Sequence, residues 1–419
     1  MLPGPHPRHR HPRHRRRALV ATALPLVLAV LAALAGCGAG SHAPQASPLA
    51  VQGGSPASPD GSSGTVGDLP APLLAGGPSC VDTVLARLGP RRYGQLVMAG
   101  VPAAGLGSAS TAALTRGAGG IIVTDGAGVP SRTVIATVTA AQRLAGTTPE
   151  LLVSTDQEGG QVQELDGAGF STIPAAVEQG RDPGPLRSAA RRWGAELRTA
   201  RVNVDLAPVA DVVDPALGTA NAPVGRFGRQ YGTDAGTAGA GVAQFVGGMQ
   251  AAGVAATLKH FPGLGKVRQN TDFAGGVVDS TTTADDADLQ PFRDGIAARA
   301  PLVMMSSARY TRIDGADLAL FSPTIMNDVL RGKLGFPGVI MTDDVGAAAA
   351  LADIPVGDRA VRFLAAGWDL VLTVRPADVP PMLQAIGERA ERDEAFRARA
   401  DDAVRRVLVL KQAQGLACR

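Results

Sequence analysis

Eight short apolar runs, rich in Val, Ile and Leu, recur along the second part of this chain and constrain its fold more than any other feature. Ala-rich segments with polar residues at helical spacing separate them, for example Leu186–Ala200, Asp234–Ala252 and Pro376–Ala390. Buried parallel strands that alternate with helices produce such a pattern. It predicts an α/β fold with a closed (β/α)8 barrel, and an open doubly wound sheet with fewer strands is the competing architecture. The runs are Gln95–Ala99, Gly120–Thr124, Leu151–Thr155, Val202–Ala207, Val254–Leu258, Pro301–Met305, Gly338–Thr342 and Asp369–Val374.

The first 36 residues have the pattern of an export signal. Met1–Arg17 is basic, Ala18–Ala35 is apolar, and small residues precede Cys37. Leu34-Ala35-Gly36-Cys37 resembles a bacterial lipobox, in which the cysteine is lipidated and becomes the new N-terminus. An uncleaved membrane helix is the rival interpretation, because the apolar run is almost long enough to span a bilayer. We expect an exported protein that is anchored to the extracytoplasmic face of the cell membrane through a lipid on Cys37.

The remaining chain divides into a tether and a globular domain. Residues 37–79 are dense in Gly, Ser, Pro and Ala, with few large apolar residues, and this composition predicts disorder. Residues 80–419 have the composition and length of one barrel domain, although length alone also allows two domains. Cys80 and Cys418 bracket this domain, and in an exported protein we expect them to form a disulfide rather than remain as two free thiols.

Several classes of function find no support in the sequence. The formal net charge of +3 includes the basic leader, and no basic patch interleaved with aromatic residues is present, so we expect no nucleic-acid partner. There is no CxxC, no HExxH and no cluster of His and Cys, so we expect no metal. Neither a Walker loop nor a convincing dinucleotide fingerprint appears, so we expect no cofactor. No serine lies in a nucleophile-elbow sequence.

Polar residues follow five successive apolar runs, where a barrel would place its chemistry. The carboxyl ends of all strands in such a barrel meet at one face, so these groups would surround one pocket. Each could alternatively cap the following helix. Many carboxylates with a few cationic partners suit the hydrolysis of a glycosidic bond. The residues are Asp156-Gln157-Glu158, Asp211, Lys259-His260, Ser306-Ser307 and Asp343-Asp344, and His260 is the only histidine after His42.

Four of these segments together carry a family resemblance. STDQEGGQVQEL (Ser154–Leu165), NVDLAPVADV (Asn203–Val212), KHFPGLG (Lys259–Gly265) and GVIMTDDVG (Gly338–Gly346) resemble successive signatures of glycoside hydrolase family three. The single-domain β-N-acetylglucosaminidases of that family, including actinobacterial lipoproteins, are the most similar group. The resemblance implies a TIM-type barrel that removes terminal β-linked N-acetylglucosamine with retention of configuration, for example from peptidoglycan fragments. We expect a monomer.

The resemblance also implies roles for individual residues. Asp343, the first aspartate of Thr-Asp-Asp, matches the family nucleophile, and Asp344 beside it would orient or cap. Asp156 matches an aspartate that binds sugar hydroxyls, and Lys259 and His260 match a pair that contacts the same ring. Arg229 matches an arginine near the bound sugar. We also expect the cationic pair to lower the pKa of Asp343 and so keep this nucleophile ionised.

The chain departs from the family in the loop that usually supplies the general acid/base. Many members carry an Asp-Ser-His there, whereas this loop reads Gln269-Asn270-Thr271-Asp272-Phe273. Asp272 is the candidate replacement, because a carboxylic acid shielded from water beside Phe273 would retain a proton to donate; it could equally be a turn-capping aspartate. Gln161 also replaces an arginine that is usual after two glycines. Two alternatives to a hydrolase therefore stand: a lipoprotein that binds muropeptide sugars without cleaving them, and a glycoside phosphorylase.

Overall fold

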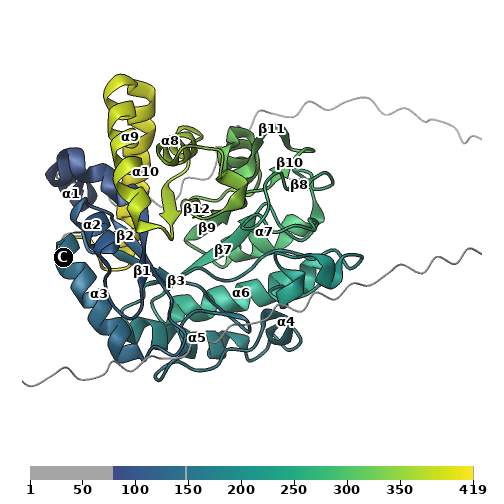
Figure 1. The fold of residues 1–419 in the computed structure, drawn as a ribbon. Helices are drawn as coiled ribbons and strands as arrows, with labels where there is room; N and C mark the ends of the chain where they lie inside the picture. Colours follow the sequence, from purple (N-terminus) through teal and green to yellow (C-terminus); the bar gives the residue numbers. More distant parts are fainter. Residues whose placement is uncertain (1–78, 147–148, 419) are drawn as a thin grey trace, which may run out of the picture. The chain divides into compact units, whose positions relative to one another are not determined.

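The computed structural model describes residues 79–146 and 149–418. The predicted export signal, Cys37 and all but the last residue of the predicted tether lie outside the described residues. Within residues 79–418, eight parallel strands close into a barrel in the order β1-β13-β12-β9-β7-β6-β3-β2, with helices around it (Figure 1). The first and last strands pair directly, with Val97 opposite Val371. The (β/α)8 prediction is therefore confirmed, and the open sheet is excluded.

Each barrel strand overlaps one of the eight apolar runs. Their side chains are almost all buried, because one face of each strand points into the barrel and the other packs against helices. The strands are β1 Val97–Pro102, β2 Gly120–Thr124, β3 Leu152–Thr155, β6 Val204–Asp205, β7 Ala255–Phe261, β9 Leu302–Met305, β12 Val339–Asp344 and β13 Leu370–Thr373.

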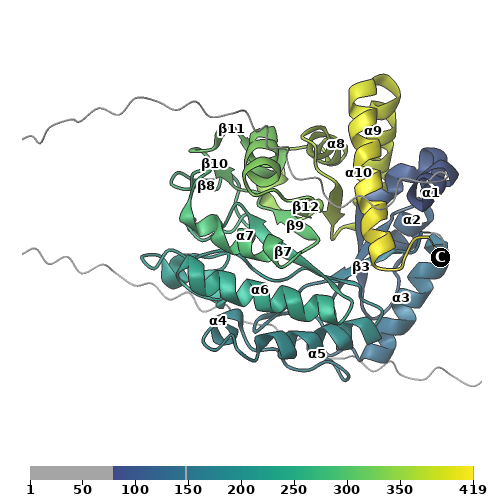
Figure 2. The same cartoon turned by 180° about the vertical axis from the view of Figure 1, so that it is seen from behind.

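Helices cover the outside of the barrel, as Figures 1 and 2 show from opposite sides. The segment predicted over Asp234–Ala252 is helical, and Asp234 caps it by accepting a hydrogen bond from the Thr237 N–H at 2.8 Å. The helices are α1 Cys80–Leu88, α2 Ser108–Thr115, α3 Ser131–Ala145, α4 Ala176–Gln179, α5 Leu186–Thr199, α6 Ala235–Ala251, α7 Gln290–Ala297, a π-helix over Ile325–Lys333, α8 Val356–Ala365, α9 Val379–Arg392 and α10 Glu394–Ala413.

Short strands outside the barrel shape the loops at its rim. β4 (Gln157–Gly159) and β5 (Val162–Gln163) form an antiparallel hairpin directly after β3. β8 (Val278–Asp279), β10 (Arg309–Tyr310) and β11 (Asp314–Leu318) form a second small sheet. These strands belong to the loops that follow β3, β7 and β9, so they lie on the face where the sequence predicts the site.

The two ends of the described chain lie side by side, as the purple α1 and the yellow α10 show in Figure 1. Cys80 and Cys418 form a disulfide there, with their Cα atoms 5.7 Å apart. Nearby, Lys411 of α10 is fully buried and donates hydrogen bonds to Gln95 Oε1 at 2.5 Å and to the Gly119 carbonyl at 2.7 Å. None of the helices in the described part of the chain is long and apolar enough to cross a membrane.

Candidate active site

One cavity of about 360 Å³ brings together all six residues that the sequence predicts to be catalytic or sugar-binding. Asp156 follows β3, Lys259 and His260 lie near the end of β7, and Asp343 lies near the end of β12. These are carboxyl ends of strands, where loops converge on one face of a barrel. The cavity is lined by Asp156, Gln161, Val162, Pro223, Phe227, Arg229, Lys259, His260, Asn270, Asp272, Phe273 and Asp343.

Glu158 connects the cations of this cavity, although the sequence analysis gave it no role. Its carboxylate accepts two hydrogen bonds from Arg229, to Oε2 at 2.8 Å and to Oε1 at 2.7 Å, and Lys259 Nζ lies 2.6 Å from Oε1. Burial alone would raise the pKa of Glu158, but the charges and hydrogen bonds of Arg229 and Lys259 outweigh it and lower that pKa to about 2. One sequence signal could have indicated this role. Glu158 lies two residues after Asp156, and side chains two residues apart in an extended chain point to the same side.

Lys259 and Arg229 stay charged although both are almost enclosed by protein. Lys259 is 1% exposed, and its ammonium group also lies 2.6 Å from Asp156 Oδ1. Burial lowers the pKa of Lys259, but Asp156 and Glu158 more than compensate and raise it above its ordinary value. Burial likewise lowers the pKa of Arg229, but the charge and hydrogen bonds of Glu158, helped by Asp211 and Asp156, raise it overall. Asp156, with about a third of its side chain exposed, is the most exposed member of this network.

His260 is oriented by Asp211, which does not itself line the cavity. Its Nδ1 lies 2.8 Å from Asp211 Oδ2, while Asp211 Oδ1 accepts hydrogen bonds from the backbone N–H groups of His260 and Leu264. Arg229 Nη2 lies 3.4 Å from His260 Nε2. A guanidinium group can only donate, so Nε2 accepts and the Nδ1–H donates to Asp211. The Lys259–His260 peptide bond is cis, and both side chains line the cavity.

The paired aspartates at the end of β12 have different surroundings. Asp343 lines the cavity, and its Oδ1 accepts a hydrogen bond from the Asp344 N–H at 2.8 Å. Asp344 instead accepts hydrogen bonds from Gly346, Ala347 and Val374 N–H groups, so it fixes the turn. Burial raises the pKa of Asp343, with a further contribution from Asp272, and the opposing influence of His260 and Lys259 does not reverse this. The expectation of a lowered pKa for Asp343 is therefore wrong, because burial outweighs the influence of this pair.

Asp272 lies at the rim of the cavity rather than inside it. Its side chain is exposed, and the neighbouring Phe273 is 84% exposed. The expectation that Phe273 shields Asp272 is therefore wrong for this conformation, since both side chains face water. Ser306, another expected rim residue, does not line the cavity; its hydroxyl accepts hydrogen bonds from Ala308 N–H and from the Tyr310 hydroxyl.

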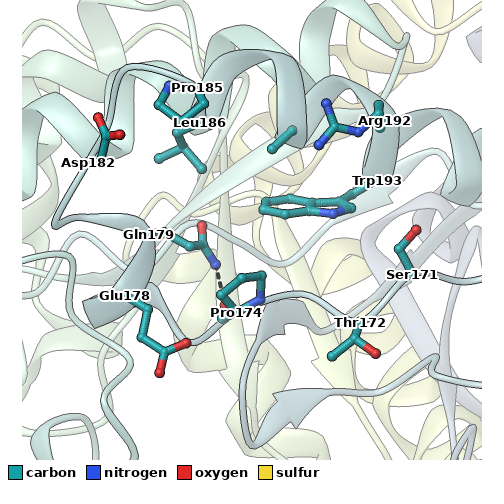
Figure 3. A pocket seen from close by; sticks show the side chains of 11 residues that line it. Ser171, Thr172, Pro174, Glu178, Gln179, Asp182, Pro185, Leu186, Arg192 and Trp193 are labelled. Atoms are coloured by element: carbon teal, nitrogen blue, oxygen red, sulfur yellow. Dashed lines mark hydrogen bonds between the residues drawn. The ribbon is translucent and has the colours of Figure 1, made fainter.

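A larger cavity, of about 600 Å³, lies beside α4 and α5 (Figure 3) and contains none of the predicted site residues. Trp193 and Leu186 form its buried floor. The Gln179 amide nitrogen donates to the Pro174 carbonyl at 2.7 Å and to the Glu158 carbonyl at 2.9 Å. A residue in the wall of this cavity thus supports the backbone of Glu158. Because the larger cavity contains none of the predicted site residues, we assign the chemistry to the smaller one. In the residues that the structure describes, no three His, Cys, Asp or Glu side chains gather in a way that could hold a metal ion.

Comparison with known proteins places the chain among related sequences and structures. Residues 92–410 match the family described as "Glycosyl hydrolase family 3 N terminal domain". The β-hexosaminidase of Stenotrophomonas maltophilia K279a is 37% identical over 269 residues, which cover 62% of this chain and 77% of that protein. The crystal structure of a β-N-acetylhexosaminidase from Beutenbergia cavernae has 44% identity and a TM-score of 0.75, covering 77% of this chain and 98% of its own. A family 3 β-N-acetylglucosaminidase from Paenibacillus sp. FPU-7 has 30% identity and a TM-score of 0.69, covering 78% of this chain and 63% of its own.

Proposed function

The chain belongs to glycosyl hydrolase family 3, and from that premise we propose how it cleaves its substrate. It is a glycosidase of the β-N-acetylhexosaminidase type, which removes terminal β-linked N-acetylglucosamine by hydrolysis. The observation that carries the mechanism is the meeting of Asp343, Asp272 and the cationic network of Glu158 in one sugar-sized cavity.

Asp343 acts as the nucleophile in this proposal. Its carboxylate attacks the anomeric carbon and forms a glycosyl ester, while the bond between that carbon and the leaving oxygen breaks. Asp272 gives its proton to the leaving oxygen. In the second half of the reaction Asp272 takes a proton from water, the resulting hydroxide equivalent attacks the anomeric carbon, and the Asp343 carboxylate is released. Two displacements at one carbon retain the β configuration of the released sugar.

The other residues position the sugar. Asp156 can accept hydrogen bonds from sugar hydroxyls while Lys259 holds it in place at 2.6 Å. His260, fixed by Asp211, offers a ring nitrogen to the cavity beside Arg229. Glu158 holds Arg229 and Lys259 at fixed separations, so these donors need no reorganisation when the sugar arrives.

The direct test is incubation of the purified protein with an aryl N-acetyl-β-glucosaminide, with and without phosphate. We expect release in buffer alone and, by proton NMR, β-N-acetylglucosamine as the first product. Release only with phosphate would make the protein a phosphorylase, and binding without release in either buffer would make it a sugar-binding lipoprotein. A first product with the α configuration would refute the retaining mechanism.

We further propose that the enzyme is exported, anchored to the membrane through Cys37, monomeric, and active on fragments of the cell wall. The sequence Leu34-Ala35-Gly36-Cys37 supports the anchor. Labelled fatty acid should be incorporated into the full chain and not into the Cys37→Ala variant. Light scattering of the purified protein reports the oligomeric state, and product release from purified peptidoglycan fragments tests the substrate.

A further inference from the structure

We infer that the phenyl ring of Phe273 is a platform on which the leaving group of the substrate stacks, and that the leaving group is itself a sugar ring. This inference rests on the proposed function, because it names the part of the same site that receives the group released by cleavage. Nothing in the catalytic steps above uses Phe273.

The exposure of Phe273 is the first observation. Its side chain is 84% exposed, whereas the other exposed large apolar residues in the described chain, Leu144, Val278 and Val409, lie between 43% and 56%. Single apolar residues at a surface are ordinary. Phe273 differs from a scattered surface residue because it lines the cavity that holds Asp343. A substrate that enters this cavity therefore meets an uncovered aromatic ring.

The backbone around Phe273 is held in place, which is the second observation. The Phe273 N–H donates to the Asn270 carbonyl at 3.1 Å, and the Ala274 N–H donates to the same carbonyl at 2.9 Å. The preceding residues are tied to the loop after β12, since the Ala349 N–H donates to the Asp272 carbonyl at 3.1 Å. A ring presented on a fixed turn loses little freedom when a ligand covers it, so it is suited to binding.

The position of Phe273 in the sequence decides which part of the substrate it meets. Asp272 must lie within hydrogen-bonding distance of the leaving oxygen to protonate it. The group attached to that oxygen is then next to Asp272 and within reach of the adjacent phenyl ring. The C–H groups on one face of a sugar ring are weakly positive, and the face of an aromatic ring is negative, so the two attract and also remove apolar surface from water.

Other residues that line the same cavity also fit a sugar ring. Gln161 and Asn270 offer amide groups that can bond hydroxyls, and both line the cavity. The cations of the cavity are occupied, because Glu158 binds Arg229 and Lys259, and Asp156 also binds Lys259. The chemical class that matches this part of the site is a hexose or N-acetylhexosamine ring, whose hydroxyls these amides can bond.

The test compares two substrates with similar leaving oxygens, the N-acetylglucosamine disaccharide and methyl N-acetyl-β-glucosaminide. For Phe273→Ala we expect kcat/KM on the disaccharide to fall about tenfold, at least about fivefold more than on the methyl glycoside, as expected when about 1.4 kcal/mol of binding is lost. Phe273→Trp keeps an aromatic face and should restore the disaccharide rate. Leu144→Ala, which removes another exposed apolar side chain from α3, is the matched control and should change neither rate.

The outcomes separate this inference from the proposed function. If the wild-type protein cleaves neither substrate, the proposed function fails. If it cleaves both and Phe273→Ala loses the same factor on each, Phe273 does not meet the leaving group and the inference is overturned. Equal values of kcat/KM for Phe273→Ala and Phe273→Trp on the disaccharide would overturn it as well, because an aromatic ring at this position would then contribute nothing to cleavage of the disaccharide.

Discussion

Replacement of Glu158 by Gln tests whether this buried carboxylate holds the cationic network together. Glu158 is 4% exposed and binds Arg229 through two hydrogen bonds and Lys259 through a third contact at 2.6 Å. Gln has nearly the same shape but no charge. Glu158→Gln therefore leaves the two enclosed cations with one ion pair among the described residues, between Lys259 and Asp156.

The size of the effect follows from the pKa of Glu158. It falls from an ordinary 4.5 to about 2 on folding, and each unit is worth about 1.4 kcal/mol, so the ionised carboxylate stabilises the fold by roughly 3 kcal/mol. Loss of one partner from a buried ion pair costs a similar amount, about 3–5 kcal/mol. Because the folded pKa is the lower one, this stability is complete above pH 4.5 and disappears as the pH falls towards about 2.

Urea unfolding followed by tryptophan fluorescence measures this difference across the pH range. We expect Glu158→Gln to lower the free energy of unfolding by about 3 kcal/mol at pH 7. The gap to wild type should narrow below pH 4.5, where the carboxylate of the unfolded chain takes up a proton, and close near pH 2, where the folded carboxylate is protonated as well and resembles the amide. Glu178→Gln, at an exposed glutamate of the other cavity, should stay within about 0.5 kcal/mol. A loss below about 1 kcal/mol, or a gap independent of pH, would refute the reasoning.

Three further substitutions test the roles assigned inside the cavity. Asp343→Asn should reduce turnover by about 10⁴-fold while calorimetry still detects binding of N-acetylglucosamine, and ordinary activity in this variant would exclude Asp343 as the nucleophile. Asp272→Ala should slow the disaccharide about 10²-fold or more but activated aryl glycosides far less, and equal losses on both would mean that another group donates the proton. Gln161→Arg adds a free cation to the lining, so it should raise kcat/KM for a disaccharide with a carboxylate on its leaving sugar by about threefold to tenfold relative to a neutral one; an unchanged ratio would place Gln161 away from the leaving group.

The fold was predictable because its signal is periodic and repeated. Each apolar run became a strand, and the ends moved only where local chemistry intervened. The first run was expected to begin at Gln95, but Gly89–Leu96 forms a 3-10 helix with Pro90 in its first turn, so the strand begins at Val97. The fourth run shortens to Val204–Asp205, since Pro208 after it has no N–H to donate to a neighbouring strand.

The membership of the site was predictable, but its electrostatics were not. Strand ends and motif order placed Asp156, Lys259 and Asp343 in one cavity. The degree of burial of each group depends on residues distant in the sequence, so the sequence indicated neither the raised pKa of Asp343 nor the exposure of Asp272. Glu158 was expected at the rim, but its role in binding the cations was missed for the same reason, because its partner Arg229 is 71 residues away and a carboxylate after a strand is also an ordinary helix cap.

The two proposed catalytic carboxylates influence each other, and this coupling gives a last prediction. The charge of Asp272 contributes to the raised pKa of Asp343, so a proton on Asp272 favours ionisation of Asp343, which is the state that the first displacement requires. Removal of that charge in Asp272→Ala should lower the pKa of Asp343. With an activated aryl glycoside, which needs no proton donor, the acidic limb of kcat/KM should therefore move to lower pH in Asp272→Ala than in wild type. A limb that stays in place would show that the two carboxylates do not interact in the free enzyme, and the influence of the Asp272 charge on the pKa of Asp343 would have to be abandoned.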